Sequence, residues 1–284
     1  MGEVKLLPEP GSEIPLGEDG KRRFLSVAAI LNYVCQDRPD VAFAVKESMR
    51  RSSAPTEADE SRLKRICRYL AGVLRAASVF EWQTVQPFVE TLVDSDFAGC
   101  LETRKSTIGG VVRVGKHIIR AYSKTLPVIS LSSGEAELGA IVRGSAETLG
   151  ICAYARDLGL SFAARVKSDA LAAIGMVGRE GLGKVRHLAV SDLWVQQMSR
   201  LKKIHYAKVE GCDNFSDALT KPLEGPELWR QMNAAGLKVL SGRSQLAPAS
   251  KRASSWAKEL QQQAADDQNG KSAGRTEEGE ENGA

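Results

Sequence analysis

Two groups of acidic residues stand where the sequence predicts that secondary-structure elements begin or end. The apolar run Thr91-Leu92-Val93 leads directly into Asp94-Ser95-Asp96, and Glu137 follows the helix-capping pattern Ser132-Ser133-Gly134-Glu135. Clustered carboxylates repel one another, and Mg²⁺ prefers hard oxygen ligands, so a few such acids together can bind a divalent cation. The alternative is that these acids are solvated at the surface, as most of the 35 Asp and Glu residues must be.

The stretches between these acids predict the elements that would position them. Apolar runs at Val111–Val114 and His117–Tyr122 flank Gly115-Lys116, which is the spacing of a β-hairpin with Gly first in a type II′ turn. Glu137 lies in the first turn of a helix that continues to about Arg156. If the first strand is central and this helix packs across one face of the sheet, Asp94 and Glu137 can converge.

A second strand end repeats the pattern. Ala164-Arg165-Val166-Lys167-Ser168 is a short predicted strand ending in Asp169, and the small apolar residues 170–177 predict a helix after it. A late strand is predicted at 204–209. Asp169 therefore lies at a strand end 32 residues after Glu137.

Composition sets broad limits. With 284 residues, 43% of them hydrophobic, the chain can bury at least one core and form one or two domains. The net charge of +4 is compatible with nucleic acid but equally with an ordinary soluble protein. Five cysteines without a Cys-x-x-Cys pair predict reduced thiols, and no apolar run approaches ~18 residues. We expect a soluble, intracellular protein, with cytoplasm and nucleus left open.

Four segments are expected along the chain. These are a flexible lead-in at 1–20, a helical segment at 21–80, the main α/β domain at 87–225, and a short helix with a disordered tail at 226–284. In the helical segment, Pro39 fits a first helical turn, and Thr56 can cap a helix whose outer face is basic. That face carries Lys64, Arg65 and Arg68, which either contact phosphates or are simply solvated.

The loop 178–187 (GREGLGKVRH) is rich in glycine and basic residues. It does not complete the phosphate-binding pattern Gly-x-x-x-x-Gly-Lys-Ser/Thr, because Val185 follows Lys184. A helix is predicted after the loop, at Leu188–Arg200.

Five segments together resemble one family. They are Asp94-Ser95-Asp96-Phe97-Ala98-Gly99-Cys100, Thr103-Arg104-Lys105-Ser106-Thr107, Leu131-Ser132-Ser133-Gly134-Glu135-Ala136-Glu137, Arg38-Pro39-Asp40-Val41-Ala42-Phe43-Ala44-Val45 and Lys64-Arg65-Ile66-Cys67-Arg68-Tyr69-Leu70-Ala71-Gly72. The first three resemble the ribonuclease H domain of copia-type retrotransposon Pol polyproteins, and the last two resemble the C-terminal end of the reverse transcriptase that precedes it. The resemblance covers about residues 22–223. It implies an α/β fold with a five-stranded mixed, ribonuclease H-like sheet, helices on both faces, and a helical connection before it.

The resemblance also implies a function. A domain of this family hydrolyses the RNA strand of RNA–DNA hybrids with two Mg²⁺ ions, for which Mn²⁺ can substitute, and its partners are the hybrid and the upstream reverse transcriptase. The catalytic and metal-binding acids would be Asp94, Glu137, Asp169 and Asp217. Two divalent ions ~3.5–4 Å apart would activate water and neutralise the leaving oxygen. Because the family's polymerase motif would lie upstream, the chain is not expected to polymerise DNA by itself.

Several neighbouring residues leave the assignment open. Asp96 and Glu135 are each two residues from a proposed ligand, so either becomes the ligand if the register differs. His187 matches a family histidine and is either an auxiliary proton carrier or a helix-terminal residue without a role. Arg104 and Lys105 would contact nucleic acid, together with the basic helix face.

The chain departs from the family pattern at five positions. These are Gly110, Tyr122, Leu138, Ala170 and Ala189. None removes a proposed metal ligand, but together they favour a divergent copy. The alternative function is therefore a catalytically inactive remnant that binds hybrids or acts as a scaffold.

Overall fold

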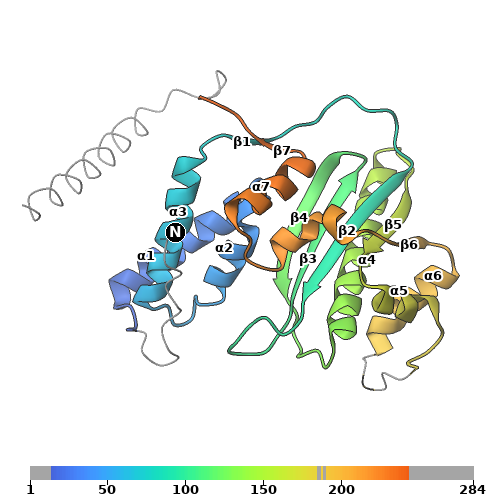
Figure 1. The fold of residues 1–284 in the computed structure, drawn as a ribbon, viewed down its shortest axis with the longest axis horizontal. Helices are drawn as coiled ribbons and strands as arrows, with labels where there is room; N and C mark the ends of the chain where they lie inside the picture. The colour runs from blue at the N-terminus through green and yellow to red at the C-terminus, as the bar shows by residue number, and fades with distance from the viewer. Residues whose placement is uncertain (1–13, 184–186, 188–189, 243–284) are drawn as a thin grey trace, which may run out of the picture. The chain divides into compact units, whose positions relative to one another are not determined.

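The computed structural model describes residues 14–183, 187 and 190–242, and its main unit is built on a five-stranded mixed sheet. The strands lie in the order β4-β3-β2-β5-β6 (Figure 1). Their bounds are β2 Phe88–Asp96, β3 Thr107–Val114, β4 His117–Thr125, β5 Ala163–Ser168 and β6 Ile204–Lys208. The pairs β2–β3 and β3–β4 are antiparallel, whereas β2–β5 and β5–β6 are parallel. The predicted fold class, with its first three strands antiparallel, is confirmed.

Strand β2 is the centre of the sheet and is buried on both faces. Val89 and Val93 point to one face and Leu92 to the other, as the twofold alternation of a strand requires, and none of the three is exposed to solvent. The neighbouring hairpin turns at Gly115, whose φ of +59° is the left-handed conformation that a primed turn needs. The sequence predicted this turn correctly.

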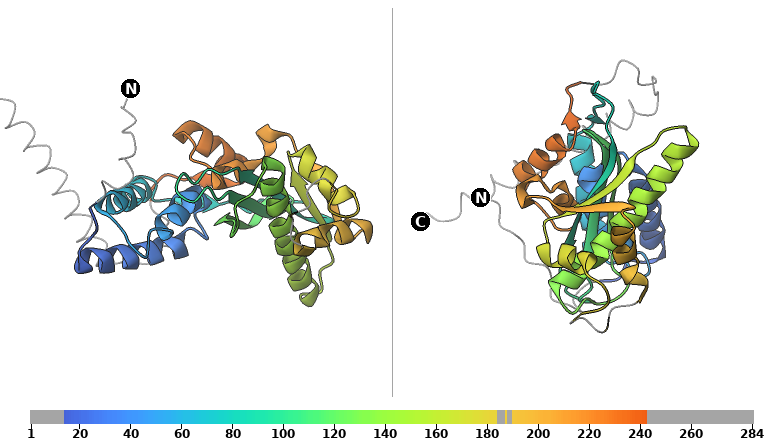
Figure 2. Two further views of the ribbon diagram at one scale, coloured as in Figure 1. Left: turned by 90° about the horizontal axis from the view of Figure 1, so that it is seen from below. Right: turned by 90° about the vertical axis from the view of Figure 1, so that its right-hand side faces the viewer.

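One face of the sheet is covered by the long helix α4 (Ser133–Asp157), which crosses β2, β3 and β5. Ser132 caps α4 by accepting a hydrogen bond from the backbone N–H of Glu135 at 3.3 Å. The hydroxyls of Thr91 on β2 and Thr148 on α4 are hydrogen-bonded to each other at 2.6 Å inside the core. The short helices α5 (Leu171–Gly178) and α6 (Trp194–Arg200) pack beside α4 (Figure 2).

The other face is covered by short elements from the C-terminal part of the unit. These are the 3₁₀ turns η3 (Gly211–Asp213) and η4 (Phe215–Leu219) and the helix α7 (Gly225–Ala234). Phe215 and Ala235 pack on Leu92. After α7, the strand β7 (Leu237–Val239) pairs with β1 (Ala76–Ser78) in a small antiparallel sheet that the sequence did not predict.

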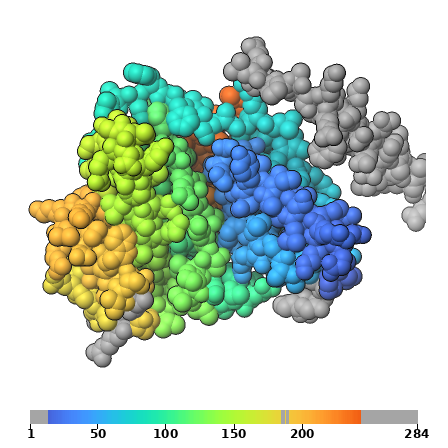
Figure 3. Space-filling model, turned by 180° about the vertical axis from the view of Figure 1, so that it is seen from behind, coloured from blue at the N-terminus to red at the C-terminus, as the bar shows by residue number. Residues whose placement is uncertain are grey.

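The helical segment comprises α1 (Glu18–Val34), the 3₁₀ turn η1 (Pro39–Val41), α2 (Ala42–Met49) and α3 (Glu57–Gly72). Thr56 caps α3 as predicted, in a reciprocal capping box with Asp59. The helices enclose their own core around Phe24, Val45 and Leu63. Figure 3 shows the first residues of the helical segment, in blue, beside green residues of the main α/β domain. A cavity of about 1020 Å³ is lined by α1, α2 and the edge strand β4.

Two predicted segments differ from the structure. Residues 14–20, expected to be flexible, include a bridge between Pro15 and Thr56 and the first turn of α1, while 1–13 lie outside the described residues. The predicted helix Leu188–Arg200 is a 3₁₀ turn, η2 (Val190–Leu193), followed by α6, because Ser191 and Asp192 are weak helix formers. Positions 188 and 189, like the tail from 243, lie outside the described residues.

Two expectations from composition concern cysteines and membranes. All five cysteines fall in the described part of the chain, and each is a free thiol. Among the described helices, none combines the length and apolar character that crossing a bilayer requires.

Candidate active site

Asp94 and Asp169 meet because two parallel strands end at the same edge of the sheet. The last paired positions of β2 and β5 are Leu92 and Lys167, so Asp94 and Asp169 lie just beyond them at the carboxyl ends. In open α/β sheets this is where ligands bind, at the point where neighbouring connections diverge. Asp94 is 6% exposed and Asp169 is partly buried.

Glu137 reaches the same place from the other layer. It lies in the second turn of α4, and its Oε1 accepts hydrogen bonds from the backbone N–H of Ser95 at 3.2 Å and from the Ser95 hydroxyl at 2.9 Å. The Ser168 hydroxyl donates to Oε2 at 3.4 Å. Ser95 points to the α4 face because its neighbour Asp94 points to the opposite one. Strand β2 thus supplies Asp94 and, through Ser95, orients Glu137.

The structure brings Asp94, Glu137 and Asp169 into one group. Each offers a carboxylate oxygen, and these oxygens lie within 4.8 Å of one another. Three hard oxygen donors at this spacing fit Mg²⁺ or Mn²⁺, which complete their coordination with water.

Asp217 lies beside this group without joining it. Its Oδ1 pairs with the ammonium of Lys221 at 3.0 Å. Its turn, η4, is anchored by Asn214, whose side-chain amide donates to the Val93 carbonyl at 3.0 Å. Thr220, at the end of the same turn, donates its hydroxyl to Asp94 Oδ2 at 2.5 Å. The fourth acid is therefore held near Asp94 by the segment that also fixes the Asp94 side chain.

Burial and mutual repulsion alter the acidity of the grouped carboxyls. Burial raises the pKa of Asp94 to about 8, assisted by the charges of Glu137 and Asp217 and opposed by the Thr220 hydrogen bond. Burial raises the pKa of Glu137 to about 7, opposed by the Ser95 hydrogen bonds and assisted by the charge of Asp169. Around neutral pH a bound cation would favour the ionised forms of Asp94 and Glu137.

The two neighbouring acids have other contacts. Asp96 turns its carboxylate over the backbone of Gly99 in the β2–β3 loop, so close that a Cβ at Gly99 would meet Asp96 Oδ2 at 1.5 Å. Glu135 accepts hydrogen bonds from the backbone of Leu131 at 2.9 Å and from Ser132, which belongs to the helix cap. Among the described residues, neither joins the group that contains Asp94.

His187 lies beside the N-terminal cap of α4, with Nε2 at 3.0 Å from Glu135 Oε2. Its side chain is 48% exposed, and five of its near neighbours in sequence, 184–186 and 188–189, lie outside the described residues. His187 thus contacts the helix cap rather than one of the grouped acids.

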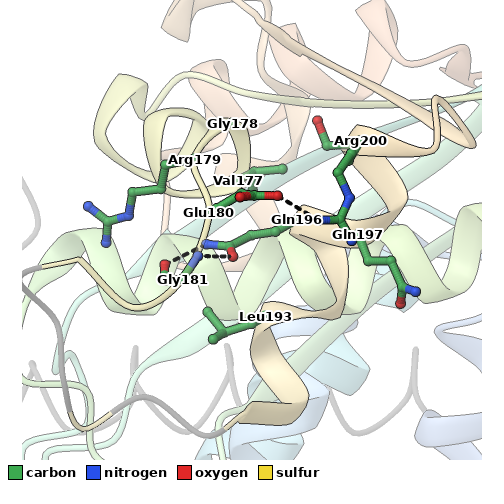
Figure 4. Close-up of a pocket in the computed structure, with 10 residues that line it drawn as sticks. Val177, Gly178, Arg179, Glu180, Gly181, Leu193, Gln196, Gln197 and Arg200 are labelled. Atoms are coloured by element: carbon green, nitrogen blue, oxygen red, sulfur yellow. Dashed lines mark hydrogen bonds and ion pairs between the residues drawn. The ribbon is translucent and has the colours of Figure 1, made fainter.

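The glycine-rich loop lines a separate cavity of about 510 Å³ (Figure 4). Its Gly181 backbone exchanges hydrogen bonds with the Gln196 side chain at 3.0 Å in both directions, and Glu180 pairs with Arg200 at 2.5 Å. The backbone N–H of Gly181 and the side-chain amide of Gln196 are therefore already hydrogen-bonded within the protein. None of the four proposed acids lines this cavity.

The basic residues proposed for nucleic acid lie at two places on the surface. Arg104 is exposed in the β2–β3 loop in the left-handed conformation, and Lys105 beside it is partly buried. Lys64, Arg65 and Arg68 are exposed on α3, where Lys64 pairs with Glu60.

Sequence reasoning overlooked three residues that position the acids: Ser95, Thr220 and Lys221. Strand alternation in Asp94-Ser95-Asp96 places Ser95 on the face opposite both aspartates, and so toward the helix that carries Glu137. Thr220 and Lys221 close the segment Ser216–Lys221, but their contacts depend on a 3₁₀ turn that no periodicity in the sequence indicates.

The sheet order and the helices on both faces define an α/β protein of the ribonuclease H-like class. Relatives found by sequence include retrovirus-related Pol polyproteins. The chain is 36% identical over 124 residues to an uncharacterized mitochondrial protein of Arabidopsis thaliana, covering 44% of this chain and 51% of that protein. It is 28% identical to the retrovirus-related Pol polyprotein from transposon RE1 of Arabidopsis thaliana, over 70% of this chain and 14% of the polyprotein. The corresponding polyprotein from transposon TNT 1-94 of Nicotiana tabacum is also 28% identical, over 72% of this chain and 16% of the polyprotein.

The homologues of this chain are thus retrovirus-related Pol polyproteins of copia-type transposons, and the predicted resemblance is confirmed. The chain spans about half of the mitochondrial relative and about one-seventh of the polyproteins. No family model matches the chain.

Solved structures that align with the chain include ribonuclease H domains. A ribonuclease H1 isolated from compost aligns with a TM-score of 0.35 and 15% identity, over 48% of this chain and 94% of that one. A foamy viral protease-reverse transcriptase in complex with double-stranded DNA aligns with a TM-score of 0.40 and 13% identity, over 70% of this chain and 39% of that one.

Proposed function

We propose that the chain is the ribonuclease H part of a retrotransposon polyprotein and hydrolyses the RNA strand of RNA–DNA hybrids with divalent metal ions. The observation that carries the proposal is the convergence of Asp94, Glu137 and Asp169 at the shared end of β2 and β5. Two divalent ions, when bound, supply an activated water and neutralise the phosphate and the leaving oxygen.

The contribution of the protein is to place the acids. Asp94 extends from a strand that is rigid because it is paired on both sides and buried on both faces. Ser95 fixes the Glu137 carboxylate through two hydrogen bonds, and Thr220 fixes that of Asp94. Asp217, held beside the group, would be the fourth acid, and His187, at the cap of α4, would be an auxiliary residue.

Recognition of the hybrid would involve the surface around the acids. An A-form-like hybrid displays 2′-hydroxyls in a wide minor groove, by which a protein distinguishes RNA from DNA. Arg104, Lys105 and the basic face of α3 would contact phosphates, an interaction that weakens as salt rises. The nuclease would be residues 87–225, and the upstream partner would be the reverse transcriptase of the polyprotein.

The alternative function is that of an inactive remnant, which the departures from the family pattern favour. Two of these departures, Gly110 and Tyr122, fit together in the structure. Gly110 on β3 is the register partner of Tyr122 on β4. A Cβ at Gly110 would meet the Tyr122 ring at 2.3 Å, so the ring fills the space that a side chain at 110 would occupy. This pair favours an intact fold with altered packing rather than decay.

The test is a cleavage assay run beside a binding titration, using the whole chain and an end-labelled RNA in a hybrid. We expect cutting with Mg²⁺ or Mn²⁺, loss of cutting in excess chelator, and no cutting of a DNA duplex of the same sequence. Tight binding without any cutting would favour the remnant. Equal cutting of the DNA duplex would indicate a general nuclease.

A further inference from the structure

Lys221 places a positive charge among the acids of the site. Its Nζ lies 3.0 Å from Asp217 Oδ1, and its side chain is 48% exposed. The ammonium is therefore the counter-ion of Asp217.

The four acids fall into a group of three and a fourth acid, Asp217, that is paired with Lys221. Asp94, Glu137 and Asp169 offer oxygens within 4.8 Å of one another, and Asp217 is absent from this group. A divalent ion can enter the group of three without breaking an ion pair. An ion that uses Asp217 Oδ1 must displace the Lys221 ammonium, and an ion at either oxygen of Asp217 is repelled by that charge at close range.

We propose that Lys221 is a positioning residue that makes the cation sites unequal: the three grouped carboxylates take the first divalent ion, and a second ion at Asp217 must displace Lys221. The inference rests on the proposed two-ion function. It adds that the second ion binds weakly until something else, such as a phosphate of the substrate, attracts the ammonium away from Asp217.

The experiment is calorimetric titration of MnCl₂ into the whole chain without nucleic acid. The variants are Lys221→Gln and, as a matched control, Lys238→Gln on β7, whose side chain is also 48% exposed and whose ammonium pairs with Glu81. Circular dichroism establishes that each variant is folded. Competition by a half-exposed ion pair and repulsion by one charge together predict an effect of about tenfold.

We expect a first binding event that is similar in wild type and both variants. A second event should be tightened about tenfold, or become visible, only in Lys221→Gln. In the Asp217→Asn background, Lys221→Gln should have no further effect on the second event. An isotherm for Lys221→Gln that matches wild type, or an equal change in the first event, overturns the proposal.

Failure of this inference is distinguishable from failure of the proposed function, because the titration contains no substrate. A chain that shows the unequal sites but cuts no hybrid refutes the nuclease and leaves the role of Lys221 standing. A chain that cuts hybrids but titrates identically with and without Lys221 refutes only the role of Lys221.

Discussion

Replacing Asp94 by Asn should stabilise the metal-free protein at alkaline pH, because the wild-type chain buries a charge there. Below about pH 4, Asp94 is protonated in the folded and unfolded chain, and Asn is a close substitute. Between about pH 4 and pH 8 the unfolded chain ionises Asp94 while the folded chain keeps it protonated. The folded state then binds more protons, so the stability of the wild type falls as pH rises through this window.

The size of the effect follows from the raised pKa of Asp94. A change from the ordinary 3.8 to about 8 corresponds to about 6 kcal/mol at ~1.4 kcal/mol per pH unit. Solvent and side chains relax around a buried charge, so we expect Asp94→Asn to gain about 2–5 kcal/mol over wild type at pH 8.5. At pH 4 the difference should be near zero. The Thr220 hydroxyl can still donate to the Asn side-chain oxygen, so this buried donor keeps its partner.

The assay is urea unfolding with chelator present, at pH 4, 6 and 8.5, for wild type and for Asp94→Asn. Only the difference between the two proteins is used, so the titration of groups that do not interact with Asp94 cancels. Asp37→Asn, at an exposed position, is the control and should show no pH-dependent gain. A difference between wild type and Asp94→Asn that is the same at all three pH values would refute the reasoning. Adding Mg²⁺ should reverse the order, because an ion that binds only the folded wild type stabilises it.

Three further predictions follow from single contacts. Asp96→Asn should leave hybrid cleavage within a few-fold of wild type in a steady-state assay, because its carboxylate lies over the β2–β3 loop rather than in the acid group; a complete loss would move the proposed ligand to position 96. Ser95→Ala should lower cleavage by tenfold or more, since it removes the hydroxyl hydrogen bond that orients Glu137, and it should lower the free energy of unfolding by up to ~1.5–3 kcal/mol in urea; unchanged kinetics would contradict this. Gly110→Ala should cost ~1–3 kcal/mol by overpacking against Tyr122, as measured by urea unfolding. Tyr122→Leu should reduce the cost of that substitution, and equal costs in both backgrounds would rule out the contact.

Local sequence rules predicted the elements that carry the acids. A hairpin turn needs a left-handed residue, and Gly115 supplies it; helix starts need a side-chain acceptor, and Thr56 and Ser132 supply it. These rules act within a few residues and so can be derived from one sequence. The convergence of Asp94 and Glu137 followed from them once a central strand and a crossing helix were assumed.

What the sequence did not predict depends on contacts between distant segments. The strands β1 and β7 have three residues each and pair across most of the chain, so neither shows a period that could be recognised. The ion pair of Asp217 with Lys221 depends on a 3₁₀ turn held by Asn214, whose partner is a carbonyl 121 residues away. The compensation between Gly110 and Tyr122 required the register of two strands.

The most direct test of the central claim is single-turnover cleavage of a hybrid by the whole chain, comparing wild type with Asp94→Asn at saturating protein and with Mg²⁺ present. If the grouped carboxylates hold the catalytic ions, Asp94→Asn should bind the hybrid as well as wild type and cut its RNA strand at least a thousandfold more slowly, a loss of about 4 kcal/mol in transition-state stabilisation. Wild-type cleavage that persists at a similar rate in Asp94→Asn would contradict the account, because the activity would then arise elsewhere in the chain.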